Sequence, residues 1–164
     1  MTKSTIAWVV LIVAASIGLS AAHTLKARRI DRLVRLLSVA PRENVFTESI
    51  VVELPDVARR YFLHAIRPGT PLARSVHLTQ SAVMKPRPDA EFVGLTADQI
   101  LTLHAGFLWN AACRMGPLSV QVVDHYTQNE GAVRVTALGL IPIETATGSD
   151  VTRSSRHRLA IESV

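Results

Sequence analysis

The chain contains a single cysteine, few aromatic residues and none of the common nucleotide-binding or zinc-binding patterns. Cys113 alone cannot build an internal disulfide framework, and a disulfide-free domain is compatible with either side of a membrane. Aromatic residues make up 5% of the chain, too few to suggest a stacking platform for nucleic acid. The patterns GxGxxG, GxxxxGKS/T, CxxC and HExxH are all missing, which argues against a nucleotide-binding α/β fold and against a zinc site.

The longest apolar run occupies residues 6–22, and a basic stretch follows it almost at once. A helix that spans a membrane needs roughly 20 apolar residues, and continuation to Leu25 brings the run to that length. We therefore predict an N-terminal membrane anchor over residues 1–25. Two alternatives stay open. One is a cleaved secretory signal with Lys3 before it and small residues at 20–22 as its cleavage site, and the other is a buried soluble helix.

The net charge of +5 is concentrated next to this run. Residues 23–74 carry an excess of basic side chains, whereas residues 75–164 are slightly acidic. Basic residues beside a membrane helix attract anionic lipid and favour the cytoplasmic side. The charge thus predicts a single-pass protein of the cell membrane with a cytoplasmic body, and it argues against nucleic acid as a partner. The residues expected to meet anionic lipid are Lys26, Arg28, Arg29, Arg32 and Arg35.

Residues 26–53 are predicted to form a basic juxtamembrane segment that begins with an amphipathic helix. Apolar residues recur there at i, i+3, i+4 and i+7, while arginines occupy the other side. The apolar positions are Ile30, Leu33, Val34 and Leu37, and Pro41 is expected to end the helix. Such a helix either lies in the headgroup region of the membrane or packs its apolar side on the folded body.

The remaining residues, 54–164, are predicted to form an α+β body. Pro55 suits the first turn of a helix over residues 54–66, and beyond Gly69 the apolar period changes to two, which is typical of strands. Strands are expected at residues 74–83 and 107–114, and a hairpin is expected at residues 120–138 with its turn at residues 128–131.

The other segments of the body carry weaker signals. Two prolines make residues 85–89 a loop, and the capping-box spacing from Thr96 to Gln99 predicts a short helical turn that ends at Leu101. Pro142 and Gly148 are expected to close the sheet region, and residues 151–164 are expected to be weakly helical. The predicted fold is a transmembrane helix and an amphipathic helix, then an antiparallel β-meander of about four strands that forms part of an open, half-barrel-like sheet.

Six segments of the body follow one another as they do in a known family. They are LPDVARRYF (54–62), RSVHLTQ (74–80), LTADQ (95–99), GFLWNAACRM (106–115), VVDHYTQNEG (122–131) and LGLIPI (138–143). In these segments the chain resembles a bacterial family of membrane-anchored proteins known only as a domain of unknown function. The resemblance implies the family's fold and an N-terminal anchor, and it brings no assigned activity. The family's β-body is similar to the open half-barrels of lipoprotein carriers.

Family members are similar to this chain through residues 153–164 and then continue, and the continuation is expected to supply further antiparallel strands. Ser155 stands where the family has an acidic residue, and the stretch LAIES matches imperfectly. Four strands would also leave two open edges and one uncovered face, a condition that natural proteins usually avoid. We therefore expect a truncated reading frame.

The residues that a metal or nucleophile site would use show no ligand spacing. They are His77, His104, Cys113, Asp124 and His125. Asp124 and His125 are neighbours in a predicted strand, so they should face opposite sides of the sheet and cannot line one site. Cys113 is expected to be a small buried apolar residue.

The best candidates for ligand binding lie on one face of the predicted sheet. Phe107, Trp109 and Met115 would line an apolar surface, with Arg114 or Tyr126 near its polar rim. The alternative is that they form the core beneath the helix at residues 54–66. The sequence thus favours a non-enzymatic, membrane-anchored protein that binds an apolar or lipid ligand without cofactor or metal. Two alternatives remain: a hydrolase-like enzyme with catalytic groups partly in a missing C-terminal half, and a non-functional fragment.

Overall fold

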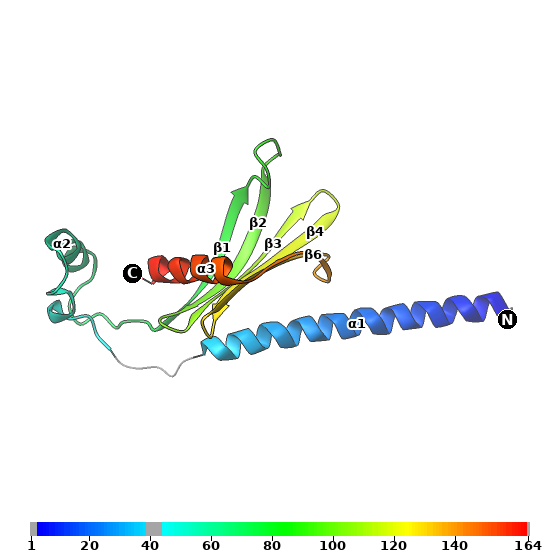
Figure 1. The fold of residues 1–164 in the computed structure, drawn as a ribbon, viewed down its shortest axis with the longest axis horizontal. Helices are drawn as coiled ribbons and strands as arrows, with labels where there is room; N and C mark the ends of the chain where they lie inside the picture. The colour runs from blue at the N-terminus through cyan, green and yellow to red at the C-terminus, as the bar shows by residue number, and fades with distance from the viewer. Residues whose placement is uncertain (1–2, 39–43, 164) are drawn as a thin grey trace.

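The structure is a computed structural model that describes residues 3–38 and 44–163, and it consists of one sheet with helices before and after it (Figure 1). The helices are α1 (Lys3–Leu37), the short 3-10 helix η1 (Glu48–Val51), α2 (Asp56–Ala65) and α3 (Ser149–Glu162). The strands are β1 (Ser75–Met84), β2 (Val93–Thr102), β3 (Gly106–Met115), β4 (Leu118–Thr127), β5 (Glu130–Ala137) and β6 (Ile141–Ala146). Pro41, the expected end of the first helix, lies outside the described residues.

The strands form one antiparallel meander in chain order, from β1 to β6. This confirms the predicted α+β class and the open antiparallel sheet. The predicted strands at residues 74–83 and 107–114, the hairpin within residues 120–138 and the C-terminal helix are all present. The sheet has six strands where the sequence suggested about four.

The predicted helical turn at residues 96–101 is wrong, because these residues belong to β2. Strand pairing places Leu95, Ala97 and Leu101 opposite apolar residues of β3, on one face of the sheet. Ala97 and Leu101 are buried there. Burial of this alternating apolar set is worth more than a local capping box, which contributes about 1 kcal/mol.

The sheet region was expected to close at Pro142 and Gly148. It ends at Ala146, before Gly148, but the Pro142 part of the prediction is wrong because Pro142 lies inside β6. Proline cannot donate a backbone hydrogen bond, so within sheets it is confined to edges and bulges. Both conditions hold here. β6 is the edge strand, and its register with β5 shifts between Val135 and Thr136.

Two helices cover opposite faces of the sheet. On one face, Leu159 of α3 packs with Leu101, Phe107 and Tyr126. On the other face, Leu33 and Leu37 of α1 pack on Leu108 of β3. The hydroxyl of Thr102 donates to the carbonyl of Leu37 at 2.8 Å. The amphipathic half of α1 therefore packs on the body, the second of its two predicted positions.

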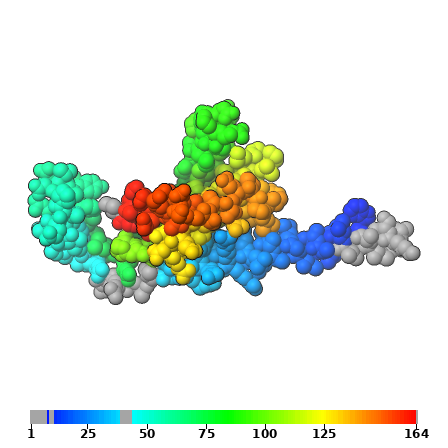
Figure 2. Space-filling view, in the orientation of Figure 1, coloured from blue at the N-terminus to red at the C-terminus, as the bar shows by residue number. Residues whose placement is uncertain are grey.

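The N-terminal half of α1 extends away from the sheet (Figures 1 and 2). The predicted anchor includes residues 6, 7, 9 and 10, whose side chains lie outside the described residues. Over the part of the chain that the structure describes, no helix combines the length and the apolar character needed to cross a membrane.

Helix α2 confirms the helix predicted over residues 54–66, but it does not cover the sheet. It lies at one end of the molecule, beside η1 and away from the strands (Figure 1). Its apolar residues Val57 and Tyr61 remain exposed. The expectation that α2 would cover the core was therefore wrong. Helix α3 covers it instead, because Leu159 packs with Phe107.

Candidate anion site between the long helix and the sheet

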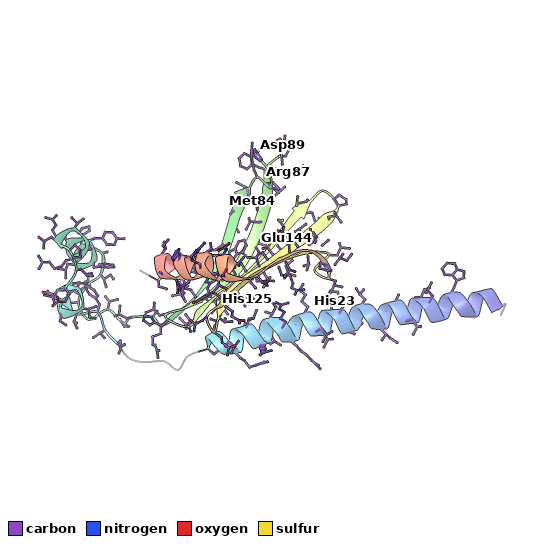
Figure 3. All side chains as sticks on the ribbon, in the orientation of Figure 1. His23, Met84, Arg87, Asp89, His125 and Glu144 are labelled. Carbon is purple, nitrogen blue, oxygen red and sulfur yellow. The ribbon has the colours of Figure 1, made fainter. Side chains whose placement is uncertain are left out.

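A small cavity lies where α1 crosses strands β4 and β5. Its volume is about 40 Å³, enough for a few atoms of a bound group. The lining consists of Lys26, Arg29 and Ile30 from α1, Gln121 and Val123 from β4, Arg134 and Thr136 from β5, and Gly139 from the turn after β5. His23 of α1 and His125 of β4 lie along the same boundary between helix and sheet (Figure 3).

Strand alternation brings the polar side chains of the sheet to this cavity. Arg134 pairs with Val123 in the β4–β5 register, and Gln121 pairs with Thr136, so all four residues share the face that α1 covers. Val133 and Val135 take the opposite face, where Val133 lies beside α3. A charged residue at an inward-facing strand position is unusual, and here Arg134 lines the same cavity as Arg29 of α1.

The turn at Gly139 allows Lys26 to reach the cavity. Gly139 has a φ of 71°, in the left-handed region that favours glycine. A Cβ at this position would lie 2.7 Å from Nζ of Lys26. Any larger residue would therefore displace the lysine as well as strain the turn.

The cavity concentrates positive charge without a counter-charge. No carboxylate lines it, and in the described residues Lys26, Arg29 and Arg134 take part in no ion pair. Burial and the nearby charge of Arg134 lower the pKa of Arg29. Two like charges in a partly desolvated place repel each other, and an anion placed between them would remove that repulsion.

Two polar atoms of residues that line the cavity have no hydrogen-bond partner among the described residues. They are Oε1 of Gln121 and Nε of Arg134, and Nδ1 of His125, which lies outside the lining on the same face of β4, is also without one. The other end of the Gln121 amide is fixed, because its Nε2 donates to Oδ1 of Asn110 at 2.6 Å. Burial, and after it the charge of Arg29, lowers the pKa of His125. Buried polar groups left without partners are expensive, so they point to an additional group at this position.

The opposite face carries a different polar cluster, which fixes α3 to the sheet. Arg158 of α3 donates to Asp124 at 2.7 Å and to Glu162 at 2.8 Å. Its guanidinium also lies 4.5 Å from the ring centre of Phe107 and 5.7 Å from that of Trp109. Burial raises the pKa of Asp124, while Arg158 opposes that shift and Glu162 adds to it.

The structure does not bring the five predicted ligand-binding residues together. Phe107 and Tyr126 are buried in the core beneath α3, and Trp109 packs against them while its Nε1 donates to Gln80 at 2.8 Å. Arg114 and Met115 lie at the far end of β3, where both are exposed. Arg114 lines an open hollow of about 470 Å³ there, together with small residues of β1, β2 and β4.

The predicted opposition of Asp124 and His125 is confirmed. Asp124 contacts α3, whereas His125 is close enough to α1 for Arg29 to shift its pKa. In the described residues, no group of three His, Cys, Asp or Glu side chains is placed to hold a metal ion. Cys113 is half-buried on β3.

Sequence reasoning missed Arg134, Gln121 and Arg158. A signal for Arg134 was present, because it alternates with Val133 and Val135 and is in phase with Val123 once the hairpin register is known. A sequence gives that register only approximately. For Arg158 the signal was its spacing of four residues from Glu162. That spacing does not reveal that Arg158 also pairs with Asp124.

Apolar side chains are exposed at the ends of three hairpins. They are Met84 and Phe92 at β1–β2, Met115 and Leu118 at β3–β4, and Leu138, Ile141 and Ile143 at β5–β6. In a meander these three turns share one end of the sheet. Figure 1 shows the β3–β4 and β5–β6 turns on the side toward which the N-terminal half of α1 extends, and Figure 3 places Met84, Arg87 and Asp89 at the β1–β2 tip.

Comparison with known proteins gives one match. Residues 44–164 match the model of a family of unknown function, DUF6544. The matched region contains Gln121, His125 and Arg134, and α1 with Lys26 and Arg29 precedes it. Neither the curated proteins nor the solved structures gave a match.

Proposed function

The chain belongs to this family of unknown function, so we propose its function from its own residues. It is a non-enzymatic domain that binds lipid or another apolar ligand, and α1 anchors it in a membrane. The observation that carries the proposal is the division of α1 into two halves. Leu33 and Leu37 bury their side chains on the sheet, whereas Trp8, Ile12 and Ile17 are exposed on the half that projects beyond it. A lipid environment would satisfy such an apolar surface.

The polar residues of the projecting half are compatible with this environment. The hydroxyl of Ser16 donates to the carbonyl of Ile12 at 2.8 Å, and that of Thr24 donates to the carbonyl of Ser20 at 2.9 Å. Hydroxyl groups that bond back to their own helix need no water. The hydroxyl groups of Ser16 and Thr24 would therefore remain hydrogen-bonded if residues 6–25 entered the hydrocarbon.

The hairpin ends support contact between the body and the membrane. Phe92, Leu118 and Ile141 are exposed at three different turns, and the cations Lys85, Arg87 and Arg114 lie near them. Apolar side chains beside basic ones are typical of surfaces that enter the headgroup region of a membrane. The hollow lined by Arg114 lies at the same end, where an acyl chain leaving the bilayer would meet it.

Among the basic residues of α1, those on the outer side remain candidates for anionic lipid at the bilayer surface. Arg28, Arg32 and Arg35 are exposed and do not line the cavity. Lys26 and Arg29 line it, although Arg29 is exposed as well. Their excess over acidic residues supports a cytoplasmic position of the body.

The polar cluster around Asp124 supports a structural role more than an enzymatic one. One carboxylate oxygen accepts a hydrogen bond from Arg158, which also contacts Glu162, so the arginine is fixed between two acids and two aromatic rings. Such a pair joins α3 to the sheet. A hydrolase-like activity through Asp124 and His125 would need groups on opposite faces of the sheet to act together.

Membrane anchoring is tested with full-length protein in bacterial membranes washed with alkaline carbonate, which releases proteins that do not span the bilayer. Wild-type protein should stay in the membrane pellet, and Val13→Arg combined with Ile17→Arg should release it, because each buried arginine costs about 2.5–3.5 kcal/mol of insertion. Ile161→Arg, an exposed change on α3, should behave as wild type. Wild-type protein in the carbonate supernatant would contradict the proposal.

The side of the membrane is tested in the same cells. Glu130→Cys in a Cys113→Ser background places an exposed thiol at the start of β5. A maleimide that cannot cross the inner membrane should label it only after the cells are opened. Labelling in intact spheroplasts would place the body outside the cytoplasm.

A further inference from the structure

We propose that the cavity between α1 and strands β4 and β5 binds a phosphate group, with Lys26, Arg29 and Arg134 as its ligands. The inference goes beyond the proposed function, because it assigns a specific polar site on the face of the sheet that α1 covers. The phosphate belongs either to a lipid headgroup or to a small molecule in solution, and the two sources are separated by the experiment below.

Charge is the first reason for a phosphate. The cavity is surrounded by three cations and has no carboxylate in its lining. Arg29 and Arg134 are close enough for the charge of one to disfavour the charge of the other. A carboxylate brings one negative charge, whereas a phosphate monoester brings up to two and can balance more of this cluster.

Hydrogen bonding is the second reason. Arginine forks match the oxygens of phosphate, and lysine supplies a point charge with three donors. Nε of Arg134 is buried and unpartnered, and the approach of Lys26 is possible because Gly139 has no side chain. Donors from a helix and a strand therefore converge on one small volume of about 40 Å³.

The unpartnered atoms at the wall extend this argument. Oε1 of Gln121 is an acceptor in the arrangement seen here, and Nε2 of the same amide is already bonded to Asn110. In its singly ionised form a phosphate monoester carries the same charge as a carboxylate, but it keeps one hydroxyl group that donates to such an acceptor, and an ionised carboxylate has none. The site thus offers partners both to the charged oxygens and to the protonated oxygen of a phosphate.

The position of the cavity along α1 makes a headgroup phosphate accessible. Lys26 directly follows Leu25, where the apolar segment ends. His23 and Lys26 also line an open hollow of about 400 Å³ on the same boundary, together with the carboxylate of Asp31. If residues 6–25 lie in the bilayer, Lys26 is at the level of the headgroups. A lipid beside α1 would then present its phosphate to the cavity without leaving the membrane.

Helix α3 provides a matched control on the other face of the sheet. Arg156 carries the same charge as Arg29, but it is exposed there and does not line the cavity. A site that recognises phosphate depends on the residues that line the cavity. General attraction of an anion to a basic protein would depend on Arg156 in similar measure.

The test uses full-length protein in neutral maltoside micelles, with binding measured by isothermal titration calorimetry. The probes are inorganic phosphate and soluble dihexanoylphosphatidic acid, each at constant ionic strength in chloride. Wild-type protein should bind at least one probe, and Arg134→Met should weaken that binding by about tenfold or more, as expected for a lost charge-assisted hydrogen bond. Arg156→Met should change it by less than about twofold. Lys26→Met provides a second variant if Arg134→Met does not fold.

Each result has a defined meaning. Binding of both probes, or of either one, with loss in Arg134→Met and Lys26→Met supports the phosphate site, and the probe that binds identifies the source as lipid, solution or both. Absence of binding to both probes overturns the proposal, as does an equal loss in Arg156→Met. Membrane anchoring is judged separately by carbonate extraction, so failure of either proposal is recognised independently of the other.

Discussion

Replacement of Leu37 by alanine tests whether the last turns of α1 are an integral part of the body. Leu37 is 1% exposed, packs with Leu33 and Leu108, and presents its carbonyl to Thr102. Removal of its three outer carbons loses about 2.4 kcal/mol of transfer free energy, and the cavity left behind raises the loss to about 3 kcal/mol. For a body of this size, about 3 kcal/mol lowers the unfolding midpoint by roughly 10 °C.

The assay is thermal unfolding of full-length protein in neutral micelles, followed by near-UV circular dichroism, to which the packed ring of Trp109 contributes. The control is Leu25→Ala on the same helix, where the side chain is 65% exposed and the expected change is within about 0.5 kcal/mol. If Leu37→Ala and Leu25→Ala have equal midpoints, α1 does not pack on the sheet in solution. The cavity lined by Lys26 and Arg134 would then also lose the side that α1 provides.

Three further outcomes are expected. Gly106→Ala should prevent folding, because a Cβ there would lie 1.8 Å from the carbonyl oxygen of Tyr126 and the φ of 136° is reserved for glycine; soluble, cooperative protein would contradict this. Arg158→Met should destabilise by about 2–4 kcal/mol at pH 7 because it leaves the Asp124 carboxylate unpaired. That loss should shrink as the pH falls and Asp124, whose pKa is already raised, takes up its proton; a loss independent of pH in urea titrations would refute the pairing. His125 has a lowered pKa, so its contribution to stability is full above pH 6.5 and is lost as the pH falls through its folded-state pKa; His125→Gln should flatten this part of the pH profile, and an unchanged slope would count against burial of a neutral imidazole.

Most of the secondary structure could be predicted because it follows from local patterns. The alternation in residues 74–83 and 107–114 and the turn residues at 128–131 gave strands that the structure confirms. The error at residues 96–101 arose because Thr96 and Gln99 satisfy a helix-capping rule while the same residues satisfy a strand alternation. Only pairing with β3 decides between these two, and pairing is not a local property.

The polar sites were less predictable than the strands. The sequence suggested a ligand surface at Phe107, Trp109 and Tyr126. Whether these residues are free to bind a ligand depends on which helix covers them, and no periodicity shows that α3 rather than α2 covers them. The sequence shows that the basic residues of α1 form a group. Their division into inward and outward members required knowledge of where the helix crosses the sheet.

The sequence by itself determined the apolar N-terminal run, the basic stretch after it, the α+β class and the opposite orientation of Asp124 and His125. These properties depend on neighbouring residues and on the fixed periods of helices and strands. Tertiary structure alone decided that α1 and α3 take the two faces of the sheet, that Arg158 meets Asp124, and that Arg134 faces Arg29 across a cavity. Such contacts join residues far apart in the chain, and their geometry is set by strand register and helix packing, which emerge only when the whole sheet is assembled.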